Sequence, residues 1–527
     1  MKQHLLLCIS SLCLAATAWA QEPDTLTTEE MEQANKPVLF KYRISLRDKK
    51  HNPYSLKHPE QFLSYKSIER RRRQHIKLDK TDLPVTPLYL SGIRACGVDI
   101  EHCSKWNNTV LISTPDTSLI ASIEALPYVL SARRVATYRE FIPKDQSGRY
   151  DLVRQANEKK ESENVSNEDP DTKEFLHNIF LNKLKEYASD APGGQDSLNI
   201  AVDFMVQANL QAISKENSEN AQKDSLDPVY GVANEQARQL HVDALHQQGF
   251  RGQGMTIAVI DGGYFNADII PMLSNTRVLG TKSFVRKGDN VYEQQTHGMM
   301  VLSCMGTNNP GQFVGTAPEA SYWLLCSEDG DSEQMVEEDN WCAAIEYADS
   351  VGADLANTSL GYSNYDTPSD NVQYWEMDGQ TRLCSRSASM AAAKGMVLCN
   401  SAGNSGSDAW RLITPPADAD NALTVGAVDS EGKAAKFSSL GNTADGRIKP
   451  DVMARGVNAS VLSIAGQPST ADGTSFSSPI LCGAVACYWQ AHPQLTALQV
   501  VEAIRALGDN HEHPNNIYGY GIPNFAK

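Results

Sequence analysis

The sequence lacks the features that would set it apart from ordinary globular proteins. No apolar run reaches the roughly 18 residues that a membrane-spanning helix needs, so no membrane span is expected. No repeated unit is found, and 41% hydrophobic with 21% charged residues excludes a wholly disordered chain, a fibre and a coiled coil. A net charge of −17 argues against nucleic acid as a partner.

Cysteine is present, but not in the pattern of a disulfide scaffold. Two of the eleven cysteines lie within residues 1–20, and the other nine are irregularly spaced. Most of these nine stand in apolar runs, so we expect them to be buried as small hydrophobic side chains. A pairing of Cys96 with Cys103 stays open.

Metal-ligand spacing is also lacking. His511-Glu512-His513 does not have the spacing of a metalloprotease helix and is followed by a proline. We therefore expect a surface loop there and predict no metal site.

Residues 1–20 have the pattern of a secretory signal peptide. Lys2 supplies a positive start, residues 5–16 are apolar but too short to span a bilayer, and Ala18 and Ala20 are small residues before a cut after Ala20. We therefore expect export to the periplasm, the cell surface or the medium.

Charge divides the remaining chain into parts. Residues 38–139 sum to +9 and residues 231–527 to −15, with an acidic stretch between them. Residues 158–174 in that stretch are almost free of apolar side chains. We predict a first domain over 21–139, a partly disordered linker or insertion over 140–230, and a second domain over 231–527.

The second domain alternates short apolar strands with helices. Such alternation predicts an α/β fold, a mostly parallel sheet covered on both faces. The predicted strands are 255–260, 322–326, 354–359, 396–401 and 423–428, and the predicted helices are 297–306, 337–350, 380–394, 475–491 and 496–507.

The first domain mixes strands and helices on the scale of a small α+β fold. Its first predicted helix, 67–76, contains four consecutive arginines from Arg70 to Arg73. Whether they form a solvated face or contact the acidic second domain stays open. The predicted strands are 38–46, 98–102, 109–113 and 129–138, and a second helix is predicted over 118–126.

Three segments of the second domain place a reactive side chain at the end of a strand or the start of a helix. Asp261 ends the apolar strand 257–260, and ligands gather outside the carboxyl ends of parallel strands. His297 opens an apolar helix beside Gly298, which permits a close approach of another segment. Ser475 lies at a helix N-terminus, where free backbone N–H groups favour negative charge.

A fourth segment, 396–406, runs as a buried strand into a turn of small residues. Asn404 lies in this turn, and its side-chain amide is suited to donate to an oxyanion. Taken singly, each segment has a plain explanation in capping, packing or turn geometry. The chain order Asp261, His297, Ser475 is nevertheless that of one known catalytic triad.

On these residues the second domain resembles the subtilisin-like serine proteases (subtilases), from about residue 230 onward. The resemblance also rests on Ser401-Ala402-Gly403-Asn404, on Gly473-Thr474-Ser475 with Pro479, and on Lys449-Pro450-Asp451. It implies a subtilisin-like three-layer domain and a serine endopeptidase that forms an acyl-enzyme. That chemistry requires no cofactor, although structural calcium is possible in the family.

The resemblance also assigns roles. Asp261, His297 and Ser475 would form the triad, and Asn404 with the Ser475 backbone N–H would hold the oxyanion. A peptide or protein substrate would lie against Ser359, Leu360, Gly361, Ala402 and Gly403. Three positions depart from the family's usual residues without removing a group that the triad needs: Gly262, Met299 and Ile480.

Residues 38–139 resemble, more loosely, the inhibitory propeptide domain of secreted subtilases, in Pro53-Tyr54-Ser55-Leu56 and Ser104-Lys105-Trp106. The resemblance implies a ferredoxin-like α+β domain that helps the protease fold, covers its active site and is then removed. The opposite charges of the two domains favour such docking. The segment would thus be an intramolecular inhibitor and chaperone of a zymogen.

Two other classes of protein require motifs that this sequence lacks. An α/β-hydrolase needs a Gly-x-Ser-x-Gly elbow and the order Ser–acid–His, and neither is found. A dinucleotide-binding site is excluded because Gly252 and Gly254 precede the strand and a third glycine is missing. Two alternatives remain: a catalytically silent binding protein with the subtilase fold, and a protease whose segment 1–230 is never released, so that it acts as a regulated binder until triggered.

Overall fold

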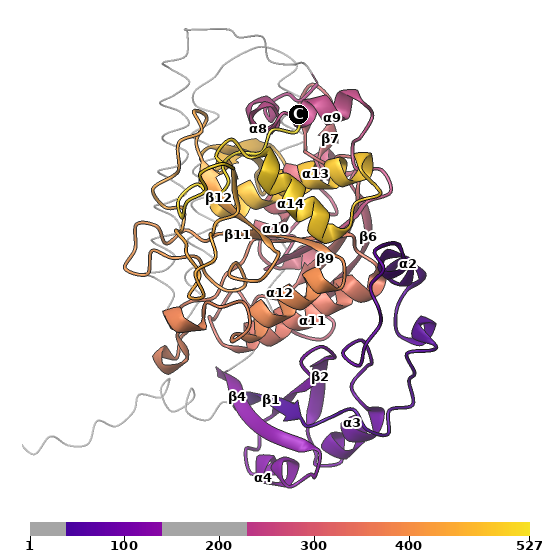
Figure 1. The fold of residues 1–527 in the computed structure, drawn as a ribbon. Helices are drawn as coiled ribbons and strands as arrows, with labels where there is room; N and C mark the ends of the chain where they lie inside the picture. Colours follow the sequence, from indigo (N-terminus) through magenta and orange to yellow (C-terminus); the bar gives the residue numbers. More distant parts are fainter. Residues whose placement is uncertain (1–37, 140–228) are drawn as a thin grey trace, which may run out of the picture.

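The computed structural model describes residues 38–139 and 229–527, which form two parts in contact (Figure 1). The predicted signal peptide and nearly all of the predicted linker lie outside the described residues. Among the described residues, no helix is both long and apolar enough to cross a membrane.

The first part is the predicted ferredoxin-like domain. Its four strands form an antiparallel sheet in the order β2-β3-β1-β4, and two helices cover one face. The elements are β1 (Val38–Leu46), α3 (Pro87–Arg94), β2 (Asp99–Ser104), β3 (Thr109–Thr114), α4 (Leu119–Glu124) and β4 (Val129–Arg139).

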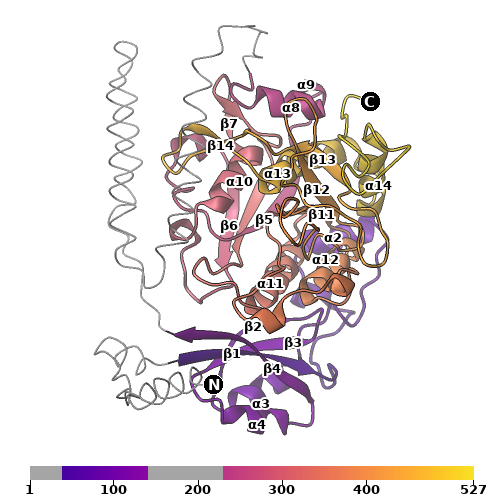
Figure 2. The same cartoon turned by 90° about the vertical axis from the view of Figure 1, so that its left-hand side faces the viewer.

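Each face of this small sheet carries buried apolar side chains. Along β3, Val110 and Ile112 pack under α3 and α4, whereas Leu111 points the other way and joins Trp106 and Val135 in a core shared with the second part. Figure 2 shows the sheet lying between its own helices and α11 (Val336–Val351). The sheet therefore needs the second part to cover its outer face.

The second part is built on a seven-stranded parallel sheet in the order β13-β12-β11-β10-β5-β9-β6. Its central strands are buried along their whole length, as is typical of a sheet with two covered faces. The strands are β5 (Thr256–Asp261), β6 (Arg277–Ser283), β9 (Ser321–Cys326), β10 (Leu355–Thr358), β11 (Val397–Ser401), β12 (Leu423–Val428) and β13 (Val452–Arg455).

Helices cover this sheet on both faces and complete the predicted three-layer fold. Ile257 and Val259 of β5 face one helical layer, and Ala258 and Ile260 face the other. The first layer contains α8 (Asn234–Leu240), α9 (Val242–Gln247), α10 (His297–Gly306), α13 (Thr474–Ala491) and α14 (Ala497–Leu507), and the second contains α11 and α12 (Leu383–Ala393).

Short elements complete the two parts, with η1 in the first part and the others in the second. They are the hairpin β14 (Ala459–Leu462) with β15 (Pro468–Ala471), the pair β7 (Asn308–Asn309) with β8 (Phe313–Val314), and the 3₁₀ turns η1 (Pro59–Gln61), η2 (Pro271–Leu273), η3 (Val291–Glu293), η4 (Pro368–Asp370) and η5 (Tyr374–Glu376).

Several elements were not predicted. Strand β6 is a polar edge strand of alternating exposure, so it lacks the apolar run that marked its neighbours. Helix α3 begins at Pro87 and is only 8 residues long, too short for clear periodicity. Strand β13 has only 4 residues.

The cysteine prediction is confirmed within the described residues. Seven of the nine cysteines described are buried, and all nine are free thiols. Cys96 and Cys103 are partly buried and do not pair, so the pairing left open by the sequence does not form.

The arginine-rich helix α2 (Tyr65–Arg73) contacts the second part, which resolves the alternative left open (Figure 1). Arg70 and Arg71 are each 2% exposed. Both pair with Asp349 near the C-terminal end of α11, and one nitrogen of Arg71 lies 2.9 Å from both Asp349 and Asp82.

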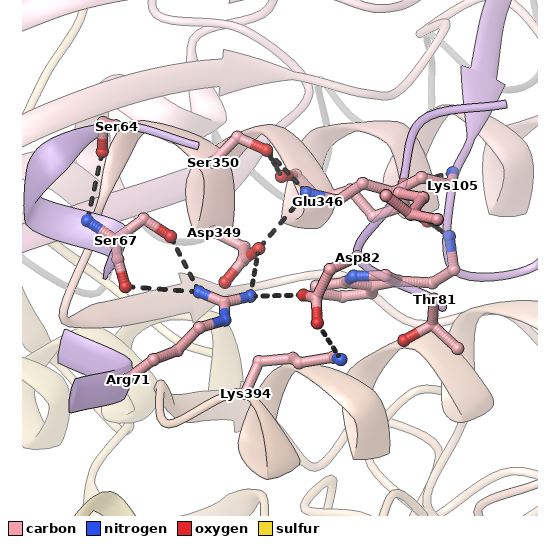
Figure 3. A network of polar contacts seen from close by, with 12 residues as sticks. Ser64, Ser67, Arg71, Thr81, Asp82, Lys105, Glu346, Asp349, Ser350 and Lys394 are labelled. Atoms are coloured by element: carbon pink, nitrogen blue, oxygen red, sulfur yellow. Dashed lines mark hydrogen bonds and ion pairs between the residues drawn. The ribbon is translucent and has the colours of Figure 1, made fainter. Parts of the chain in front are cut away.

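Asp349 is the centre of this network (Figure 3). Lys105 reaches the same carboxylate at 3.3 Å. Burial alone would raise the pKa of Asp349, but the positive charges of Lys105, Arg71 and Arg70 hold it well below its ordinary value. The carboxylate therefore stays ionised in a site that water does not reach.

We expect Arg71→Ala to destabilise the docked helix. Removing one partner of a buried ion network typically costs about 3–5 kcal/mol, because Asp82 and Asp349 would keep their charge without it. The measurement is hydrogen–deuterium exchange of the amides in α2 of the full chain.

The control is Arg72→Ala on the same helix. Arg72 is exposed and, among the described residues, pairs with Glu69 alone, so its loss should cost no more than about 1 kcal/mol. Equal exchange in the two variants would contradict the assigned role of the buried network.

Candidate active site

The end of β5, the start of α10 and the start of α13 meet at the carboxyl edge of the parallel sheet. The chain order places β9 and β6 on one side of β5 and β10 to β13 on the other, so the order reverses between β5 and β10. Crevices form at such reversal points. Asp261 ends β5 there, and Ser359 follows β10 directly.

Asp261 and His297 are hydrogen-bonded. His297 Nδ1 lies 2.7 Å from Asp261 Oδ1, which also accepts the Gly262 N–H at 2.8 Å. The Asp261 side chain is fully buried, whereas that of His297 is 34% exposed. The carboxylate thus holds one ring nitrogen and leaves Nε2 for a reacting group.

Gly298 makes this contact possible. A Cβ atom at this position would lie 2.4 Å from the Gly263 carbonyl oxygen and 2.8 Å from Asp261 Cβ. Only glycine therefore lets α10 start directly against the end of β5, as its place beside His297 predicted.

The pKa of His297 is raised above its ordinary value of 6.5. Burial acts to lower it, but the charge of Asp261 and the hydrogen bond between the two side chains outweigh that effect. The site is therefore arranged to stabilise an imidazolium when one forms.

Gly262, the residue after Asp261, has no side chain that could bond the Asp261 carboxylate. Asp261 Oδ2 is buried and has no hydrogen-bond partner among the described residues. A Cβ atom at Gly262 would lie 2.6 Å from Gln295 Oε1, so the Gln295 side chain covers the space that a larger residue would fill.

Ser475 is the second residue of α13, and two hydrogen bonds join it to Ser359, the residue after β10. Its hydroxyl donates a long hydrogen bond of 3.4 Å to the Ser359 carbonyl, and Ser359 Oγ donates to the Ser475 carbonyl at 2.8 Å. Phe476, the next residue, has its ring centroid 5.9 Å from that of His297. Asp261 and His297 are therefore in direct contact, and Ser475 adjoins them through its neighbour Phe476.

Pro479 explains the second contact. A helix would normally supply the N–H of residue 479 to the Ser475 carbonyl, and proline has no N–H. The Ser359 hydroxyl takes this role, so the turn that carries Ser475 is bonded to the segment after β10.

Two buried residues that sequence reasoning missed support this arrangement. Asn357 donates to Ser359 Oγ at 3.1 Å and accepts from Ser478 Oγ at 2.8 Å. Their signal in the sequence is weak, because a polar residue in a buried strand is recognised only when its partner is known.

Asn404 is oriented by a third missed residue, Thr474. The Asn404 carbonyl oxygen accepts from both the backbone N–H and the hydroxyl of Thr474, each at 2.9 Å. With the oxygen engaged, the amide nitrogen is directed away from these donors and is available to a ligand. Gly473 lies beside this amide, where a Cβ atom would be 3.6 Å from Asn404 Nδ2.

A cleft of about 530 Å³ begins at His297 and includes Ser359, Leu360 and Gly361. Ala402 is fully buried and does not line this cleft, nor does Gly403. Thr414, which was also not predicted, lies between Gly361 and Gly403. A Cβ atom at Gly361 would lie 2.0 Å from the Thr414 hydroxyl, and one at Gly403 would lie 3.3 Å from it.

Within residues 38–139 and 229–527, no group of three or more His, Cys, Asp or Glu side chains is placed to hold a metal ion.

Family models match both parts of the chain. Residues 252–521 match the Subtilase family (Peptidase_S8), and residues 41–149 match the Peptidase S8 propeptide domain of Bacteroidota. The chain belongs to the subtilase family of serine proteases and carries a propeptide domain of that family.

Individual relatives match somewhat more than half of the chain. Serine protease AprX of Bacillus subtilis (strain 168) is 30% identical over 310 residues, 53% of this chain and 66% of that protein, so the chain spans slightly less than two thirds of its length. Subtilisin NAT of Bacillus subtilis subsp. natto is 29% identical over 303 residues, 56% of this chain and 69% of that protein. A solved structure of the MycP3 protease from a type VII (ESX-3) secretion system is 23% identical, covers 57% of this chain and 88% of that one, and has a TM-score of 0.45.

We expect the His297 imidazole to titrate above pH 6.5, and Asp261→Asn to bring its midpoint below that value, because burial then acts without the opposing charge. A raised folded pKa means that this pair stabilises the fold fully below pH 6.5 and loses that effect as pH rises through the folded value. NMR titration of the Ser475→Ala chain measures the midpoint.

The control for this titration is Asp408→Asn, which removes an exposed carboxylate on the loop after Asn404. An equal midpoint in all three chains would contradict the assigned role of Asp261.

Proposed function

We propose that this protein is an exported serine endopeptidase that hydrolyses peptide bonds through Asp261, His297 and Ser475. The observation that carries the proposal is the 2.7 Å hydrogen bond between Asp261 and His297, formed beside the N-terminal turn of α13 that bears Ser475. A buried carboxylate, an imidazole and a hydroxyl in this order suit acyl transfer.

In the first half of the reaction, His297 Nε2 accepts the Ser475 hydroxyl proton as Oγ attacks the peptide carbonyl carbon. Asp261 holds the imidazole by Nδ1 and stabilises its positive charge. The amide of Asn404 and the backbone N–H of Ser475 donate to the oxyanion, and one such donor typically contributes about 3–4 kcal/mol. The imidazolium then gives its proton to the leaving amine, and the C–N bond breaks.

In the second half, His297 accepts a proton from water as the water oxygen attacks the acyl-enzyme carbonyl. The ester bond to Ser475 Oγ breaks, the proton returns to that oxygen, and the product leaves as a carboxylic acid. All reacting groups in this scheme come from the protein and from water. Structural calcium stays a prediction without assigned ligands.

The zymogen proposal rests on the contact between the two parts. The first part buries Trp106 and Leu111 in a shared core and pairs its arginines with Asp349. Arg43 forms two further 2.6 Å hydrogen bonds with Asp339 at the start of α11. A segment bound this way would stabilise the protease part and cover it until the chain is cut. Export rests on the sequence pattern of residues 1–20.

The first prediction of this proposal concerns self-cleavage. Intact-mass analysis of the chain without residues 1–20 should find a cut within 140–230, whereas Ser475→Ala should stay full length because it lacks the nucleophile. If both chains stay whole, a peptide-cleavage assay on residues 231–527 decides. Inactivity there would support the silent binding protein instead.

A second prediction concerns inhibition. Separately produced residues 38–139 should slow peptide cleavage by the processed protease, and do so less as salt screens the charge attraction. The matched control is the same segment with Arg71→Ala, which removes one buried partner of Asp349. Failure of the unaltered segment to inhibit, even at low salt, contradicts the inhibitor role.

A further inference from the structure

The cleft beside His297 is lined by an unusual density of acid. Among its thirteen lining residues no lysine or arginine is found, and six are carboxylates. They come from the loop between β9 and α11, from the start of α11, and from the loop after β10: Glu328, Asp329, Asp331, Glu333, Glu337 and Asp366.

One of these carboxylates is buried without a full set of partners. Glu337 is 1% exposed, and its Oε1 accepts only the Asp329 N–H at 3.2 Å. Its Oε2 accepts no hydrogen bond from any donor in the described residues. A buried carboxylate oxygen without a donor is costly, so a proton or an incoming cation is needed beside it.

The neighbouring acidic residues strengthen the requirement for a proton or a cation beside Glu337. Burial raises the pKa of Glu328, Glu333 and Glu337, and the charges of nearby carboxylates raise it further. Asp329, in the same cleft, is paired with Arg286 at 2.8 Å. With six carboxyl groups and no lysine or arginine in its lining, the cleft favours a positive group, whose arrival would draw protons off Glu328 and Glu337.

A metal ion is a poor candidate for that group, since these carboxylates do not converge as metal ligands in the described part of the chain. The cleft is instead continuous with Ser359 to Gly361, the segment along which the proposed substrate lies. A long cationic side chain of the substrate can reach several separate carboxylates along such a wall.

The first part indicates which side of the cut bond lies here. Strand β4 ends at the cleft loop, where the Thr137 N–H donates to Gln334 Oε1 at 2.8 Å. Charges of Asp329 and Glu337 act on Tyr138, the next residue. A cut after β4 leaves this chain on the acyl side, so residues that precede the cut bond approach this cleft.

We propose that this acidic cleft gives the protease a preference for substrates with lysine or arginine among the residues preceding the bond that is cut. Glu328 and Glu333 are the specificity-determining residues. This inference rests on the proposed function, because it names the substrate class of the same site.

The test uses the self-processed full chain and pairs of peptides that differ only by arginine or its neutral analogue citrulline. The exchange is made in turn at each of the four positions before the cut bond. At one position or more, kcat/KM should be at least about 10-fold higher for arginine. Raising the salt to about 0.5 M should reduce that ratio.

The variants locate the effect. Glu333→Gln, at an exposed position, should lower the arginine-to-citrulline ratio, and Glu328→Gln with Glu333→Gln should bring it below about 3-fold. The control Glu512→Gln removes an exposed carboxylate outside the cleft and should leave the ratio unchanged.

The outcomes separate this inference from the proposed function. Equal cleavage of both peptides at every position overturns the preference and leaves the protease. A preference that survives in the double variant overturns its assignment to this cleft. Absence of cleavage of every peptide, charged or neutral, contradicts the proposed function and the preference with it.

Discussion

The hydrogen bond between His297 and Asp261 depends on the close approach of a helix to the end of a strand. Gly298 allows that approach because a side chain there would strike the backbone of Gly263. Once α10 is seated, its first residue projects over the carboxyl edge of the sheet, where the order of strands reverses. The start of α13 faces the same point, and the Ser359 hydroxyl holds it there in place of the helical donor that Pro479 lacks. Backbone packing therefore determines where the three side chains of the site lie.

The contact with the first part follows a different logic. A carboxylate near the C-terminal end of a helix opposes the helix dipole, and Asp349 is such a residue. It is also fully buried, which makes its charge expensive without partners. Arginines of α2 and Lys105 supply those partners from a domain whose outer sheet face also carries buried apolar side chains. Each part therefore presents a surface that is poorly suited to water and well suited to the other, and apolar area and buried charge act together.

The sequence predicted the main architecture and the residues that now lie together in the site. Short apolar runs identified the central strands, and the end positions of Asp261, His297 and Ser475 identified their common edge. The polar edge strand β6 was missed because it has no apolar run. The supporting roles of Asn357 and Thr474 were missed because they depend on specific partners that the fold brings to them. The acidic cleft was missed for a third reason. Glu328 to Glu337 look like a solvated charged loop, and only the fold of the β9–α11 loop turns them toward Ser359.

The placement of the first part ahead of the protease part has a consequence for timing. While the chain is whole, the two parts cannot drift apart, so the surface around Asp349 experiences a high effective concentration of its partner. A single cut in the connecting stretch changes none of the contacts. It changes only the entropy gained on separation. The fraction of the two parts that stays bound then depends on the total concentration and on the ionic strength. Dilution would then release what the covalent chain had held, and the timing of release would be set by the surroundings of the molecule rather than by a rearrangement within it.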